Sequence, residues 1–73
     1  MNVETAKDEL KRITDEVLGS NGSHVESTLE SRVFNIYTEV WQITREQLAQ
    51  MEARVDITAI SVEGYNLMLT AKI

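Results

Sequence analysis

The residue in this sequence best suited to catalysis or metal binding is its one histidine, His24. It lies two residues before Glu26 and six before Glu30, and the position four residues after it is Thr28. A metal-binding or catalytic histidine on a helix needs a second ligand at such spacing, and threonine is a poor ligand. We therefore interpret His24 as a solvated residue near the start of a helix, and we predict no metal site.

Two pairs of adjacent acids are the next candidates, Asp8 with Glu9 and Asp15 with Glu16. Acid–base catalysis requires two carboxyl groups that face one pocket in unlike environments. Neighbours on a helix point about 100° apart, and lysines and arginines lie beside these acids. No Gly-x-Ser-x-Gly motif occurs, and no hydroxyl has a base within local reach. These residues predict a solvated face, and we expect no enzyme activity.

The segment Gly19–Ser23 is the one stretch that could suggest a phosphate-binding loop. Such loops follow a strand and usually carry a lysine at the start of the next helix. Here a predicted helix precedes the loop and no lysine follows it. We interpret the segment as a plain turn, and we predict no cofactor.

Phe34, Tyr37 and Trp41 are spaced to form an aromatic ridge on one side of a helix. Two interpretations stay open, packing into the core and anchoring an interface, because tryptophan and tyrosine carry much of the binding energy where proteins meet. Only Arg32 and Arg45 lie nearby, so a platform for nucleic-acid bases is not predicted. The predicted interface consists of Phe34, Tyr37, Trp41, Leu48, Met51, Leu67 and Leu69.

Composition narrows the function classes further. The chain has 12 acidic and 7 basic residues, a net charge of −5 and no cysteine, which argues against direct nucleic-acid binding and excludes disulfides and thiolate metal sites. No apolar stretch approaches the length of about 20 residues that spans a bilayer, and no leader segment is evident. We expect a soluble, cytoplasmic protein with no membrane partner.

The elements that must position these residues form a single small domain of 73 residues. We predict a helix at 3–18, because Val3, Ala6, Leu10, Ile13 and Val17 share one face; Asn2 would cap it and Gly19 would end it. A turn at 19–23 follows. A second helix is predicted at 24–54, started by a capping box at Ser23 and Glu26. It either continues to 54 or breaks near 44, where Thr44 and Gln47 form another box.

The tail at 55–73 alternates in polarity and predicts a β-hairpin. A three-residue loop of Val62, Glu63 and Gly64 would keep one face of this hairpin apolar, with Ala59 opposite Leu67. The second strand, Tyr65 to Ile73, would then lie at the edge of the sheet, where either a helix or the termini cover it or it pairs with its copy in a second subunit.

The predicted fold is α+β, with two helices packed on a C-terminal antiparallel hairpin. Its alternative makes residues 32–43 a third strand and leaves a short helix at 45–54. A domain of this size buries only about 60% of its unfolded surface, so we expect a second copy to complete the core. The predicted function is that of a non-catalytic, acidic protein-binding or regulatory module acting as a homo-oligomer, with a dimer favoured. The alternatives are a phage-type inhibitor of a nucleic-acid-processing enzyme and a structural subunit of a larger particle.

Overall fold

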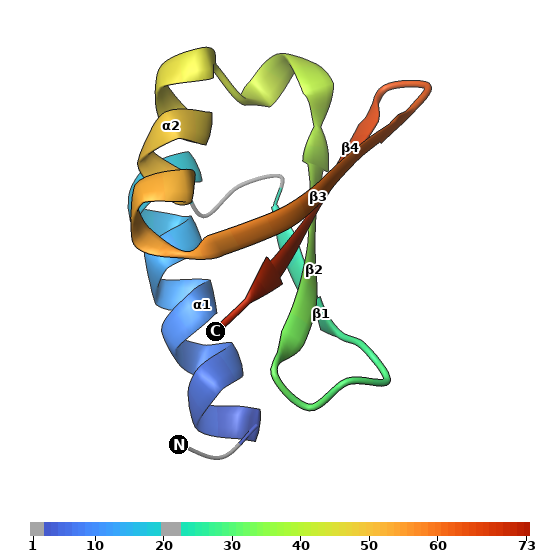
Figure 1. The fold of residues 1–73 in the computed structure, drawn as a ribbon. Coiled ribbons are helices and arrows are strands. Elements are labelled where there is room, and N and C mark those ends of the chain that lie inside the picture. Colours follow the sequence, from blue (N-terminus) through green and yellow to red (C-terminus); the bar gives the residue numbers. More distant parts are fainter. Residues whose placement is uncertain (1–2, 20–22) are drawn as a thin grey trace.

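The computed structural model describes residues 3–19 and 23–73, and it has the predicted α+β class. Figure 1 shows both helices on one face of a four-stranded antiparallel sheet. The sheet has the order β1-β2-β4-β3. In chain order the elements are α1 (Val3–Leu18), β1 (His24–Ser27), β2 (Val33–Glu39), the 3-10 helix η1 (Val40–Gln42), α2 (Arg45–Arg54), β3 (Asp56–Glu63) and β4 (Asn66–Lys72).

The first helix has the predicted bounds, 3–18. Ala6, Leu10 and Ile13 from its apolar stripe are buried in the core. Gly19 ends the helix in the left-handed conformation (φ 84°), and its N–H donates to the carbonyl of Asp15 at 3.0 Å, as expected of a glycine that follows a helix. The proposed cap Asn2 and residues 20–22 of the expected turn lie outside the described residues.

The predicted helix at 24–54 is wrong over its first two thirds. Residues 24–27 and 33–39 are strands that pair with each other, and Val25 lies opposite Ile36. The capping box expected at Ser23 and Glu26 therefore starts no helix; Glu26 lies in β1.

Strand propensity prevailed over helical spacing in this segment. The predicted ridge combines Trp41 of η1 with Phe34 and Tyr37 of β2, and these two β2 residues lie on opposite faces of the strand. Within its true bounds β2 alternates regularly: Phe34, Ile36 and Thr38 are buried on the helix side. The β-branched and aromatic residues of this segment were the correct signal.

The alternative prediction, a strand at 32–43 and a short helix at 45–54, is correct for the helix, which is α2, and for most of the strand, since β2 ends at Glu39 and η1 follows it. α2 begins at the predicted box: the Gln47 N–H donates to Thr44 Oγ1 (3.1 Å), and the Thr44 N–H donates to Gln47 Oε1 (2.8 Å). Gln47 also donates to the carbonyl of Val17 (3.2 Å), and Arg54 pairs with Glu16 (2.6 Å). These contacts fix α2 beside the C-terminal half of α1.

The hairpin at 55–73 is confirmed, but its predicted register is wrong. Glu63 pairs with Asn66, so the loop is Gly64–Tyr65, a two-residue turn. Gly64 has a φ of 61°, the left-handed value that a type II′ turn requires at its first central position.

A β-bulge explains why this shorter loop does not mix the faces. Between Ile57 and Ala59 the register shifts, and Thr58 is the extra residue; its hydroxyl donates to the Thr70 carbonyl at 3.3 Å. The shift changes the phase of the strand. As a result Ile57 and Ile60 lie on the same face, opposite Ala71 and Leu69.

The prediction that Tyr65–Ile73 lies at the edge of the sheet is also wrong. β4 lies between β2 and β3. The Ile73 N–H donates to the Arg32 carbonyl (3.0 Å), and Arg32 Nε donates to the Ile73 carbonyl (2.6 Å). The edge strands are β1 and β3.

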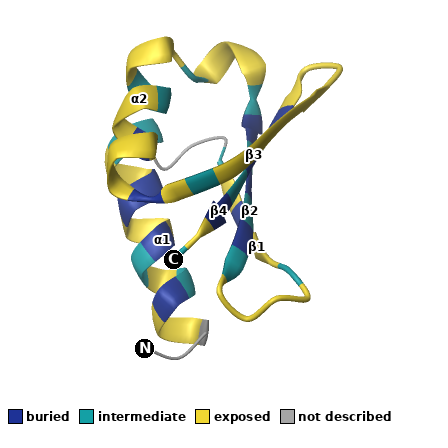
Figure 2. Cartoon of the chain, viewed as in Figure 1, coloured by how far each residue is buried: buried dark blue, intermediate teal, exposed yellow. Residues whose placement is uncertain are grey.

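The core lies between the helices and the inner face of the sheet (Figure 2). Its largest fully buried side chains are Phe34, Leu10, Ile36, Met51, Leu69 and Thr14. The buried Thr14 hydroxyl donates to the Leu10 carbonyl at 2.8 Å, so this polar group is satisfied.

The two leucines at opposite extremes of exposure provide a test of this core. Leu69 is 0% exposed and Leu29 is 106% exposed. We expect Leu69→Ala to lower the free energy of unfolding by about 2–5 kcal/mol or to abolish the cooperative transition. The same substitution at Leu29 should change it by less than about 0.5 kcal/mol. Urea titration followed by circular dichroism measures both, and equal losses would contradict the placement of Leu69.

Candidate functional site

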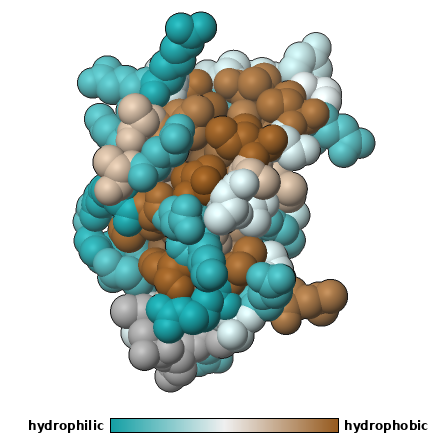
Figure 3. Space-filling model, viewed as in Figure 1, coloured by the Kyte–Doolittle hydropathy of each residue, from teal (hydrophilic) through white to brown (hydrophobic). Residues whose placement is uncertain are grey.

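An apolar surface lies where the β3–β4 hairpin extends past the helix layer. We define the hairpin surface by its exposed members, with their exposed fractions: Val40 (37%), Trp41 (62%), Ile60 (48%), Val62 (55%) and Tyr65 (71%). Figure 3 shows hydrophobic atoms gathered between α2, η1 and the hairpin. Large apolar side chains that cluster in this way on a small protein mark interaction sites more often than scattered ones do.

The length of the elements explains this exposure. α2 has 10 residues and β3 has 8, which correspond to about 15 Å of helix and about 27 Å of strand. The helix therefore covers only part of the strand. Ile57, near the start of β3, packs against the core, whereas Ile60 and Val62 on the same face are about half exposed.

The two aromatic residues of the hairpin surface are held against each other. The N–H of Val40 donates to the Tyr65 carbonyl at 2.8 Å, which ties η1 to the hairpin turn. The rings of Trp41 and Tyr65 then meet edge to face, with centroids 5.2 Å apart and planes at 60°. This geometry is favourable for aromatic pairs, and it presents both rings at the surface in a fixed arrangement.

The free edge of β3 borders the hairpin surface. Figure 2 shows the strand exposed along most of its length. Its sequence contains no proline, lysine or arginine, and its acids, Asp56 and Glu63, stand at its two ends. Proteins usually guard such edges with charges, prolines or bulges. Of these guards, β3 has the bulge at Thr58 near its start and one acid at each end.

The structure separates the residues predicted to form an interface. Phe34, Met51, Leu67 and Leu69 lie in the core of the chain itself, with at most 7% exposure, and so they contribute no surface. Leu48 packs against the core and is partly exposed. Tyr37 lies half-buried on the opposite face of the sheet, where it pairs with Met68. Only Trp41 of this set belongs to the hairpin surface.

Sequence reasoning missed Val40, Ile60, Val62 and Tyr65. The predicted three-residue loop places Val62 in the turn, and a ladder without a bulge places Ile60 on the face opposite Ile57. The signal that could have found them is the spacing of Ile57, Ile60 and Val62, which fits one face only when a bulge intervenes.

His24 is exposed as predicted, although it lies in a strand and not at a helix start. Its side chain is 66% exposed and its Nε2 lies 3.0 Å from Glu26 Oε1. The Tyr37 ring is 6.4 Å away between centroids. Within residues 3–19 and 23–73, His, Cys, Asp and Glu side chains form no group of three or more that could hold a metal ion.

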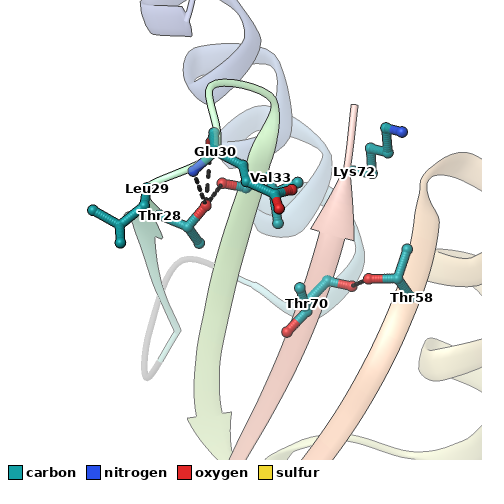
Figure 4. A pocket seen from close by; sticks show the side chains of 7 residues that line it. All are labelled: Thr28, Leu29, Glu30, Val33, Thr58, Thr70 and Lys72. Atoms are coloured by element: carbon teal, nitrogen blue, oxygen red, sulfur yellow. Dashed lines mark hydrogen bonds between the residues drawn. The ribbon is translucent and has the colours of Figure 1, made fainter.

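An open hollow crosses the face of the sheet that is turned away from the helices (Figure 4). Its hydroxyl groups are already engaged: Thr28 donates to the Val33 carbonyl (2.7 Å), Thr58 to the Thr70 carbonyl (3.3 Å) and Thr70 to Asn35 Oδ1 (3.0 Å). Leu29, Glu30 and Lys72 complete the lining. A nucleophilic hydroxyl needs a neighbouring base, and the partners of these three are carbonyl oxygens.

The acidic residues of α1 form a surface network with arginines. Glu9 and Glu16 both bond to Arg12, and Glu16 also bonds to Arg54 of α2. The hydrogen bond from Arg12 lowers the pKa of Glu9, and the hydrogen bond from Arg54 lowers the pKa of Glu16. A general acid needs the opposite shift, so these carboxylates act as structural partners of the helix pair.

Comparisons with family models, with curated proteins and with solved structures found no match to this chain. In the described parts of the chain, neither helix combines the length and the apolar character needed to cross a membrane.

The lowered pKa of Glu16 predicts how acid affects stability. A carboxylate whose pKa is lower in the folded state stabilises the fold above its unfolded pKa, about 4.3 for glutamate, and this contribution is lost as the pH falls through the folded value. We expect Glu16→Gln to reduce the loss of stability between about pH 5 and pH 3. Thermal unfolding at each pH measures it. Glu52→Gln, exposed on α2 outside this network, is the control, and equal changes in both variants would contradict the assignment.

Proposed function

We propose that this chain is a small, non-catalytic protein-binding module of the cytoplasm that acts as a homo-oligomer, with a dimer as the favoured state. The observation that carries the proposal is the hairpin surface, which presents Trp41 and Tyr65 beside Ile60 and Val62 along an open strand edge. Tryptophan and tyrosine are enriched among the residues that dominate binding energy. The absence of cysteine accords with a reducing compartment.

The energetics of a small chain support association. In the single chain the side chains of Trp41, Tyr65, Ile60 and Val62 are exposed. Their burial in a complex would stabilise it by about 25 cal/mol per Å² of apolar area. The rings of Trp41 and Tyr65 are already restrained by their edge contact, so ordering them on binding costs less entropy.

A structural subunit of a larger particle is a second candidate. The sheet has two edges, β1 and β3, and pairing of unlike edges would add copies without closure. The four-residue length of β1 weakens this candidate, since an edge of that length offers few hydrogen bonds.

Mass measurement tests the proposal directly. Size-exclusion chromatography with light scattering on the purified chain should give about twice the 8.3 kDa of one copy at micromolar concentration. Trp41→Ala should raise the dissociation constant by about 30-fold, the effect of removing an interface anchor worth about 2 kcal/mol. Tyr37→Ala, an aromatic truncation on the other face of the sheet, is the matched control and should leave the mass unchanged.

Trp41 is the one tryptophan in the chain, so its fluorescence reports on the hairpin surface alone. Dilution of the dimer should raise the quenching of Trp41 by acrylamide as the ring becomes exposed. A monomeric mass at all concentrations, with Trp41 freely quenched throughout, would refute the oligomer. A series of growing masses would favour the particle subunit.

A further inference from the structure

We infer that two copies associate through antiparallel pairing of their β3 strands around a two-fold axis at Ser61, which joins the two sheets into one of eight strands. This inference rests on the proposed homo-oligomer and specifies the surface and the register that it uses.

The free edge of β3 is limited at both ends. The bulge at Thr58 interrupts the ladder near the start of the strand, and the turn at Gly64 ends it. Regular pairing along this edge is therefore restricted to Ala59–Glu63. Ser61 is the central residue of that stretch, so a two-fold axis at Ser61 is the arrangement that uses its whole length.

The backbone N–H and C=O groups of Ala59–Glu63 are also arranged for pairing about an axis at Ser61. Glu63 and Asn66 flank the two-residue turn, and residues in that position exchange hydrogen bonds within their own hairpin. Because inward and outward backbone groups alternate along a strand, Ile60 and Val62 direct their N–H and C=O groups to the free edge. With the axis at Ser61, Ile60 of one copy lies opposite Val62 of the other, and these are the residues with groups to exchange.

Charge favours this register over full-length pairing. If β3 paired end to end with its copy, Asp56 would lie opposite Glu63, and like charges directly opposite are destabilising. With the axis at Ser61, Glu63 lies opposite Ala59 of the second copy. Asp56 then falls beyond the paired stretch, and the paired apolar residues keep the same face of the joined sheet.

The exposed area of the two aromatic rings is too small for a stable interface without the strand edge. Trp41 and Tyr65 expose 62% and 71% of their surfaces, about 270 Å² together at about 200 Å² for each residue. A stable interface buries about 800 Å² on each partner, so the rings alone fall short. Pairing through β3 adds the strand edge with Ile60 and Val62, and the two-fold axis keeps these residues of both copies on the same face of the joined sheet.

A second copy fits this edge better than β1 of a neighbouring copy does. β1 has four residues, and its acid Glu26 and its histidine His24 form their own contact. Pairing of β3 with β3 is self-complementary and closes at two copies. It leaves β1 free and produces no further growth.

Cysteine cross-linking tests the axis, because the chain contains no cysteine of its own. At a two-fold axis Ser61 lies opposite Ser61 in a pair without hydrogen bonds, where Cα atoms are about 4.5 Å apart, a distance compatible with a disulfide. We expect Ser61→Cys to form a covalent dimer under mild oxidation at least tenfold faster than Ser27→Cys, the matched control on the β1 edge. Equal rates, or no cross-link at Ser61 in a chain that is dimeric by mass, would overturn the β3 pairing while leaving the homo-oligomer intact. A monomeric wild type would overturn both.

Charge reversal provides a second, non-covalent test of the same axis. Ser61→Lys and Ser61→Glu each place like charges opposite each other, and each alone should raise the dissociation constant by about fivefold. A mixture of the two variants should form a heterodimer at least as tight as the wild-type dimer. Weakening of the mixture to the same extent as the separate variants would show that residue 61 does not meet its own copy, and circular dichroism of each variant verifies that its fold is retained.

Discussion

The mismatch between a short helix and a long strand is the constraint on which the rest of this structure depends. α2 spans about 15 Å and β3 about 27 Å, so α2 cannot cover the whole length of β3. The core closes over Leu69 and Ala71, while Ile60 and Val62 on the adjacent strand stay about half exposed. The most apolar part of the surface is thus a consequence of element length.

The bulge at Thr58 determines which residues of β3 lie on the face that α2 leaves exposed. Without it, Ile57 and Ile60 would lie on opposite faces of β3, and the end of the hairpin would be mixed in polarity. With it, Ile57 enters the core and Ile60 and Val62 continue the same face beyond the helices. The same irregularity shortens the edge available for pairing, so a single residue determines both the apolar face and the length of the free edge.

The polar groups of the chain serve its architecture. Threonine hydroxyls on the open face of the sheet donate to backbone or amide oxygens. Glu16 of α1 pairs with Arg12 of the same helix and with Arg54 of α2, and the second pair joins the two helices. The arginine hydrogen bonds lower the pKa of Glu9 and of Glu16, so these ion pairs persist at a lower pH than an ordinary glutamate would allow. The hairpin surface is a cluster of apolar residues whose exposure is not explained by such internal roles.

Local signals in the sequence were sufficient wherever neighbouring residues define an element. The apolar stripe of α1, the glycine at position 19 and the Thr44–Gln47 box each act within a few residues, and they placed α1 and the start of α2 correctly. The alternation of 55–73 likewise identified a hairpin, since side-chain direction in a strand repeats every two residues.

Tertiary structure decided the rest, because strand pairing depends on partners distant in the chain. Residues 33–39 carry both helical spacing and strand propensity, and the two edges supplied by β1 and β4 resolved that ambiguity. The bulge likewise depends on how Ile57 and Ile60 meet β4. Which strand lies at the edge, and hence which apolar residues face solvent, follows from that pairing and from the length of α2.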